Sequence, residues 1–464
     1  MRAMVRRRST ALLVATAAVS LVAAGCSSSK KNTATPSSAA PATSAAASVA
    51  APSSSAPAPA SSAPAPASSA PTPVSSAPAP ASSAAAPADP FATPNAASGS
   101  PVVFGVLNIQ SGPVTFPETL QAEQAAVSYV NAYKGGIGGH PIKLVSCITD
   151  GQPSTSQRCA NQILSDKPVA IMGGADTGAP GAIPVWQRAN LAYLGGVPFT
   201  PAEQNYANAV IFSSISTADN AAASVYAAQT LGVKSAAVIA TSDTQGTSVM
   251  NNVIIPTMKA AGITKVTPIL LPPTSSDVSS AVATALGAHP DLIYINAPAA
   301  CPNILASLKQ LGNTAKIMGI DPCTSPPALK GANGGANGLY FASPVFDPGS
   351  GTPDSNEYLA IVKKYQPNLV LDSPAAIGFQ TVFDVQAALA SFTTADLTTA
   401  KILAAFRTGQ STPNFMGHPY LCDGKQLAGA PAICNSYEQI RQVQGTSIVV
   451  ASKDFVTPGA FYKG

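Results

Sequence analysis

The sequence is poor in charged residues, histidine and tryptophan. Charged residues make up 10% of the chain, and its 464 residues include three histidines and one tryptophan. Lys and Arg exceed Asp and Glu by four, and the first 25 residues hold four arginines and no acid, so the remainder has no net charge. A chain without a basic excess lacks the charge that nucleic-acid binding requires. Because the histidines are scattered and no cysteine pair has zinc-finger spacing, we expect no metal and no cofactor.

The first 26 residues have the parts of a secretory signal. Arginines precede the apolar run at residues 11–24, which is too short to span a bilayer. The Ala-Ala-Gly before Cys26 resembles a bacterial lipobox, in which the signal is cut before a Cys that is then lipidated. An ordinary cleaved signal is the alternative. We expect a signal peptide over residues 1–25, lipidation at Cys26, and a protein on the outer face of the cell membrane, held there only by acyl chains.

Residues 26–100 consist mostly of Ala, Pro, Ser and Thr. A seven-residue unit with two prolines repeats between residues 54 and 81. Proline removes a helix donor and clashes with the preceding turn, so this heptad is no coiled coil. The segment buries too little apolar surface to fold, and we expect a disordered tether. O-glycosylation of such a stalk remains open.

Residues 101–464 show the alternation that is typical of an α/β fold. At about 364 residues this region exceeds one ordinary core, which favours two domains. Strands alternating with helices predict parallel sheets flanked by helices, with ligands bound at the carboxyl ends of the strands. The expected strands cover residues 102–107, 142–149, 169–172, 236–240, 266–271 and 292–295. The expected helices cover residues 117–133, 154–165 and 278–286, and a further helix ends at residue 261.

Six cysteines remain besides Cys26, and they lie along the chain as three successive pairs. Outside the cytoplasm we expect them to form disulfides. Six cysteines allow fifteen connectivities, so sequential pairing is a hypothesis that rests on proximity. The pairs would be Cys147 with Cys159, Cys301 with Cys323, and Cys422 with Cys434.

Several motifs resemble the type I periplasmic binding proteins, in particular the Leu/Ile/Val-binding, branched-chain amino-acid receptor family. The resemblance covers roughly residues 102–424. It rests on Phe-Gly-Val-Leu at 104–107 with Ser-Gly-Pro at 111–113, and on the run Val-Asn-Ala-Tyr-Lys-Gly-Gly-Ile-Gly-Gly-His-Pro-Ile at 130–142. Ala-Asn-Gln-Ile-Leu at 160–164, Ile-Met-Gly-Gly at 171–174 and Ile-Met-Gly at 317–319 continue it.

The resemblance implies two α/β lobes, each a parallel sheet flanked by helices, joined by a hinge of three crossing strands. The first lobe would hold approximately residues 101–216 and 344–424, and the second approximately residues 217–343 and 425–464. Such proteins close on a small ligand between the lobes and deliver it to an ABC permease. We expect a monomer without enzymatic activity.

The first-lobe candidates for ligand binding follow strands. Ser111 and Gly112 follow the first strand, Asp176 and Thr177 follow the third, and Val197 lies in the next loop. The family binds polar ligand groups with backbone N–H groups and hydroxyls at the loop of Asp176 and Thr177, although either residue could instead cap the next helix. Asp176 and Pro198 depart from the family pattern, which weakens the match to an amino-acid clamp.

The second-lobe candidates are Gln245 and Asp321. Gln245 stands where the family commonly has an aromatic residue. Asp321 aligns with an acid that accepts the ammonium of amino-acid ligands, and a turn role before Pro322 is equally open. These features predict a solute-binding lipoprotein of an ABC importer that captures an amino acid or a related amide or carboxylate. A ligand-sensing receptor on the same fold is the alternative.

An enzyme is not favoured by the motifs. Asp-Thr-Gly at 176–178 also spells an aspartic-protease tripeptide, but that chemistry needs a second carboxylate copy, which is missing. Neither a nucleophile elbow nor a phosphate-binding loop occurs in the sequence.

Overall fold

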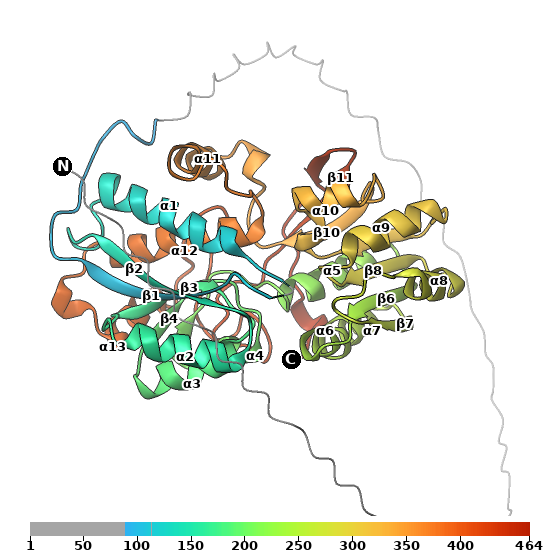
Figure 1. The fold of residues 1–464 in the computed structure, drawn as a ribbon, viewed down its shortest axis with the longest axis horizontal. Coiled ribbons are helices and arrows are strands. Elements are labelled where there is room, and N and C mark those ends of the chain that lie inside the picture. Colours follow the sequence, from blue (N-terminus) through green and yellow to red (C-terminus); the bar gives the residue numbers. More distant parts are fainter. Residues whose placement is uncertain (1–88, 113) are drawn as a thin grey trace, which may run out of the picture. The chain divides into compact units, whose positions relative to one another are not determined.

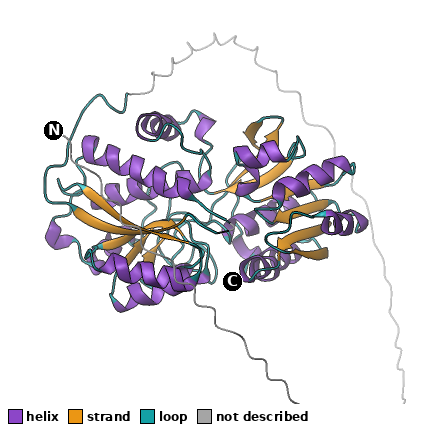
Figure 2. Ribbon diagram, in the orientation of Figure 1, coloured by secondary structure: helices purple, strands orange, loops and turns teal. Residues whose placement is uncertain are grey.

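The computed structural model describes residues 89–112 and 114–464, which belong to one compact unit. The signal peptide, Cys26 and the expected tether up to residue 88 lie outside the described residues, whereas residues 89–99 of that tether are bound to the first lobe and are not disordered. Figure 1 follows the elements along the chain, and Figure 2 shows helices on both faces of the strands. No described helix is both long and apolar enough to cross a membrane.

The first sheet is parallel throughout and has the strand order β2-β1-β3-β4-β5. Its strands are β1 (Val102–Ile109), β2 (Ile142–Thr149), β3 (Ala170–Ala175), β4 (Ala192–Leu194) and β5 (Ala209–Val210). The helices of this lobe are α1 (Pro117–Tyr133), α2 (Pro153–Leu164), α3 (Ala179–Arg188), α4 (Pro201–Gln204), α11 (Pro353–Tyr365), α12 (Ser373–Leu389) and α13 (Thr399–Phe406). Helices distant in sequence complete the lobe, since Phe379 of α12 and Phe406 of α13 share one buried core with Phe104 of β1.

The second sheet has the order β12-β11-β10-β9-β8-β6-β7, parallel from β7 to β10, with β11 and β12 antiparallel at one edge. Its strands are β6 (Ser235–Thr241), β7 (Lys265–Leu271), β8 (Leu292–Asn296), β9 (Lys316–Gly319), β10 (Leu339–Ser343), β11 (Gln439–Gln444) and β12 (Ser447–Val450). Its helices are α5 (Ala218–Gln229), α6 (Thr244–Val249), α7 (Ile255–Ala261), α8 (Ser279–Gly287), α9 (Cys301–Gln310) and α10 (Pro326–Gly331).

The expected helix ending at Ala261 is interrupted. A π-helical segment, Met250–Ile254, separates α6 from α7. Pro256 is the second residue after this segment, and a proline inside a helix cannot donate to the preceding turn. The wider π turn accommodates that missing bond. Short 3-10 turns occur at Asp321–Thr324, Pro348–Ser350, Thr394–Asp396 and Gly459–Phe461.

The chain passes between the sheets after β5, after β10 and before β11. The last passage comes later than the approximate boundary at residue 424 that the sequence suggested. Ile433 pairs with Ile211 beside β5, and Leu427 and Ile433 are buried together with Leu107 of β1. We therefore assign residues up to Cys434 to the first lobe.

A segment that precedes β1 is bound to the first lobe. This strap, residues 89–99, places the Phe91 ring 5.8 Å from the ring of Tyr129 and 5.4 Å from that of Tyr133. Lys364 of α11 holds its ammonium 4.1 Å from the Phe91 ring centroid. Backbone bonds join the strap to the turn after α1, including one from Gly135 N–H to Asn95 O at 2.7 Å.

The cysteines pair sequentially, which confirms the predicted pairing. The disulfides are Cys147–Cys159, Cys301–Cys323 and Cys422–Cys434. Each joins segments that are close in sequence, and none links the two lobes.

Candidate functional site

The loops after β1, β2 and β3 meet in the first lobe. Ser111, after β1, donates its hydroxyl to the carbonyl of Thr149 at 3.2 Å. Thr149 ends β2 and donates its own hydroxyl to Asp176 Oδ1 at 2.8 Å. Gly112 has φ +103 and lies so near Asp150 that a Cβ would be 3.0 Å from its carbonyl oxygen. The structure thus brings the candidates after β1 and β3 together, with Ser111 and Gly112 exposed.

The carboxylate of Asp176 is turned into its own lobe. Asp176 is 4% exposed, and Oδ1 also accepts from the N–H of Gly178 at 3.1 Å. Burial raises the pKa of this carboxyl. Thr177 is less enclosed and donates to Gly151 O at 3.4 Å. The structure therefore gives Asp176 a part in shaping the loop after β3.

Val197 is bound by its backbone to the first sheet. Its N–H donates to Gly174 O at 2.8 Å, and its side chain is fully buried in the core of this lobe. The loop then continues to Phe199, which stacks on Phe116 from the loop after β1 with 5.1 Å between ring centroids. Sequence reasoning missed this aromatic pair, although both rings lie in loops that follow strands.

Gln245 links the lobes. It stands in the first turn of α6, after β6 of the second sheet, and donates its amide to the carbonyl of Phe199 in the first lobe at 3.5 Å. Hydrogen-bonding groups therefore lie where the loop after β4 meets the loop after β6. They are the amide of Gln245 and the carbonyl of Phe199, next to the Phe199 ring.

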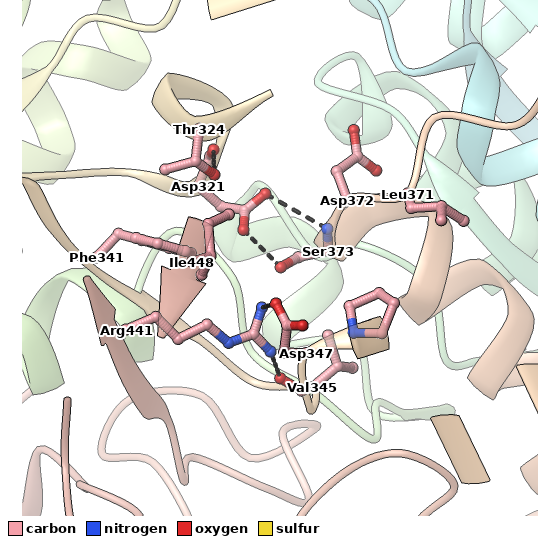
Figure 3. Close-up of a pocket in the computed structure, with 11 residues that line it drawn as sticks. Asp321, Thr324, Phe341, Val345, Asp347, Leu371, Asp372, Ser373, Arg441 and Ile448 are labelled. Carbon is pink, nitrogen blue, oxygen red and sulfur yellow. Dashed lines mark hydrogen bonds and ion pairs between the residues drawn. The ribbon is translucent and has the colours of Figure 1, made fainter. Parts of the chain in front are cut away.

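Asp321 also links the lobes, but through other partners. It follows β9 and is 3% exposed. Its Oδ2 accepts from the hydroxyl of Ser373, the first residue of α12, at 2.6 Å, and its Oδ1 accepts from Ser373 N–H at 3.4 Å. Figure 3 shows the carboxylate facing Ser373. No hydrogen bond connects Asp321 to the other candidates among the described residues.

A cation missed by sequence reasoning lies beside Asp321. Arg441 of β11 is 3% exposed, donates to Val345 O, and holds Nη1 3.7 Å from Asp347 Oδ2. Arg441, Asp321 and Asp347 line one small cavity of about 30 Å³, together with Ser373 (Figure 3). Nothing in the local sequence marked Arg441, because β11 reaches this place only through the antiparallel edge of the second sheet.

Further buried carboxyls surround this group. Burial raises the pKa of Glu118 at the start of α1 to about 7, and that of Asp219 at the start of α5 to about 6. Burial also raises the pKa of Asp372, which caps α12 by accepting from Ala375 N–H at 3.0 Å. Glu438, before β11, is fully buried and has a raised pKa as well. In the part of the chain that the structure describes, no group of acids, histidines or cysteines is arranged to hold a metal ion.

The chain belongs to the periplasmic binding protein family, whose model matches residues 101–430. The match confirms the predicted family and the two-sheet α/β fold. Membership implies a small-molecule ligand, a location outside the cytoplasm and an ABC permease as partner. A search of the curated proteins found no match.

Solved structures of the same fold are similar at low identity. A leucine-binding protein from Thermotoga maritima is 17% identical with a TM-score of 0.64, covering 77% of this chain and 99% of its own. A fatty acid ABC transporter substrate-binding protein from Thermomonospora curvata is 16% identical with a TM-score of 0.65, and the match covers 80% of this chain and 95% of that protein. A third structure is the branched-chain amino acid transporter substrate-binding protein from Streptococcus pneumoniae in complex with isoleucine. It is 15% identical with a TM-score of 0.64, and the match covers 77% of this chain and 100% of that protein.

Proposed function

We propose that this protein is the solute-binding lipoprotein of an ABC importer and that it captures a small molecule between its lobes. The observation that carries the proposal is the pair of polar contacts that join the two lobes, from Gln245 to Phe199 and from Ser373 to Asp321. Parallel sheets bind ligands at this edge, and a hinge of three crossings allows the lobes to close around a ligand.

The binding residues on this proposal lie between the loops after β1, β3, β4 and β6. Ser111, Gly112 and Thr177 offer hydroxyl or backbone donors from the first lobe, and Gln245 offers an amide from the second. Asp176 and Val197 shape the loops that carry them. Phe199, which stacks on the buried Phe116, supplies an apolar surface. These groups suit binding, and we propose no catalytic role for any of them.

The ligand class includes amino acids and related amides and carboxylates. The similar structures are named for leucine, isoleucine and fatty acid, so the fold accommodates both amino acids and carboxylic acids. Thermal unfolding of the protein against a panel of amino acids, amides, short carboxylic acids and sugars tests the proposal. A ligand at 100 times its dissociation constant stabilises by about 2.7 kcal/mol, a visible shift. The proposal fails if a broad panel gives no shift while the protein is folded.

Uptake distinguishes an importer from a sensor. Cells that lack this protein should lose uptake of the labelled compound found in the panel, and the wild-type gene should restore it. Normal uptake with an altered transcriptional response to the compound would favour the ligand-sensing receptor instead.

Membrane attachment is tested separately. We propose that Cys26 carries the acyl chains, so Cys26→Ser should move the protein from the membrane fraction to the medium and abolish labelling by a fatty-acid analogue. Retention of Cys26→Ser in the membrane would contradict the lipid anchor. Equilibrium sedimentation of the released protein tests the proposed monomer.

A further inference from the structure

We infer that Asp321 has a structural role and holds the two lobes together through its hydrogen bonds. We infer further that the site takes a ligand without an ammonium group, namely an aliphatic or aromatic carboxylate or its amide. The inference rests on the proposed solute-binding function and narrows its ligand class. It departs from the amino-acid receptors that the sequence resembles, where an acid at this place is expected to accept the ligand's ammonium.

Both oxygens of Asp321 already have partners. Ser373 of α12 donates its hydroxyl to Oδ2 and its N–H to Oδ1, and the carboxylate is almost completely buried. The Ser373 hydroxyl lies 2.8 Å from the hydroxyl of Ser343, at the end of β10 where the chain crosses between the sheets. Through Ser373, Asp321 is therefore bonded at the point where the chain crosses between the sheets after β10. A ligand ammonium would have to break these bonds before it could bind there.

The protein supplies its own cation at this place. Arg441 lines the same cavity as Asp321 and Asp347, and its guanidinium is bonded to the backbone of Val345. A second cation in this cavity would lie beside the guanidinium at low dielectric, where like charges repel strongly. The cavity itself, about 30 Å³, holds on the order of two water molecules and excludes an amino acid.

Two of the neighbouring acids are hydrogen-bonded within the protein. Asp219 accepts from the backbone N–H of Asn220 at 2.7 Å and from its side-chain amide at 3.1 Å. Asp372 is satisfied as the cap of α12. Glu438 has no hydrogen-bond partner for either oxygen and is fully buried, a setting that favours the protonated, uncharged carboxyl.

The candidate residues left for the ligand are uncharged. They are Ser111 and Gln245, together with the half-buried ring of Phe199. Hydroxyl and amide groups donate to a carboxylate or an amide, and the Phe199 ring favours an apolar body. None of these three groups is an acid, so this combination fits an apolar acid or amide better than a zwitterion.

A double-mutant cycle on the full-length protein tests the role of Asp321 without any ligand. The variants are Asp321→Asn, Ser373→Ala and the double mutant, with exposed Asp166→Asn as the control. We expect each single change to lower the melting temperature and the double change to cost clearly less than their sum. Additive effects would show that Asp321 and Ser373 do not stabilise the protein through their mutual hydrogen bonds, and would overturn the structural role of Asp321. If Asp321→Asn does not fold, Ser373→Ala should still destabilise while Ser373→Thr, which keeps the hydroxyl, does not.

Calorimetric titration with matched compounds tests the ligand class. The pairs are leucine with 4-methylpentanoate and 4-methylpentanamide, and phenylalanine with 3-phenylpropanoate. We expect an acid or amide to bind at least tenfold more tightly than its amino acid. Tighter binding of an amino acid, weakened tenfold by Asp321→Asn, would overturn both parts of the inference.

Failure of the inference and failure of the proposed function give different results. Binding of a sugar in place of these compounds counts against the ligand class and keeps the solute-binding function. Lack of binding by every compound in the wider panel counts against the function itself. The double-mutant cycle still decides the role of Asp321 in either case.

Discussion

Glu123 of α1 accepts a hydrogen bond from the backbone N–H of Gly174 at 2.9 Å, although its side chain is fully buried. Its other oxygen has no partner. Burial raises the pKa of Glu123 to about 8, and that of Glu203, which binds the backbone and hydroxyl of Thr200, to about 8 as well. These raised pKa values favour the protonated form of both carboxyls in the folded protein at neutral pH.

The stability of the protein should fall as the pH rises from 5 to 8. A folded pKa above the unfolded value means that the folded state holds the proton more tightly. The stabilisation is complete below about 4.5 and is lost as the pH rises through about 8. Each group contributes a slope of about 1.4 kcal/mol per pH unit. Urea unfolding at several pH values measures it.

Glu123→Gln should reduce this slope because the amide does not titrate. The exposed Asp166→Asn should leave the slope unchanged. A free energy of unfolding that is constant between pH 5 and pH 8 in the wild-type protein would contradict the raised pKa values.

Gly196→Ala should be strongly destabilising. Gly196 has φ +79, and a Cβ there would lie 2.6 Å from the Cα of Gly173 on the neighbouring strand. We expect a loss of about 3 kcal/mol from backbone strain and the steric clash together. Gly232→Ala is the matched control, since Gly232 has φ +70 with nothing within 4 Å. It should cost about 1 kcal/mol, from the backbone alone. Equal losses of unfolding free energy in the two variants would show that the close contact between Gly196 and Gly173 does not limit the size of the side chain at residue 196.

The three disulfides should be reduced in a defined order under native conditions. Cys301 and Cys323 are both fully buried, whereas Cys147 and Cys422 are 7% and 8% exposed. Thiol exchange requires access to sulfur, so Cys301–Cys323 should survive longest in dithiothreitol. Timed alkylation followed by peptide mapping gives the order. Early alkylation of Cys301 would mean that the turn at Asp321–Thr324 opens readily.

Phe91→Ala should release the strap. The ring packs against Tyr129 and Tyr133 and lies under Lys364, so its removal should cost about 2 kcal/mol. Lys364→Met keeps most of the side-chain packing and removes the cation, and it should cost less than about 1 kcal/mol. Hydrogen exchange at the amides of Asn95 and Ala97 reports the strap directly. Unchanged protection in Phe91→Ala would show that the backbone bonds hold it alone.

The sequence predicted the local elements well wherever the apolar pattern was long and uninterrupted. The helix expected at residues 117–133 and the strand at 142–149 have those bounds in the structure. The break between α6 and α7 was missed, although Pro256 gave a signal. The family motifs predicted the two lobes because they lie at strand ends and turns that define the fold.

The arrangement around Asp321 could not be predicted from the sequence. Its partner Ser373 is 52 residues away and Arg441 is farther still, so no local spacing reveals them. Their meeting depends on α12 joining the first lobe and β11 joining the second sheet. The resemblance to the family singled out Asp321, but a resemblance of motifs carries no information on which group fills the space in front of a carboxylate.

The strap has a mechanical consequence. Any pull on the chain from its N-terminal side reaches the bonds between residues 95–99 and the turn after α1 before it reaches β1. These contacts lie wholly within the first lobe. The load is therefore borne by the lobe that carries α1, and it does not pass through the second sheet.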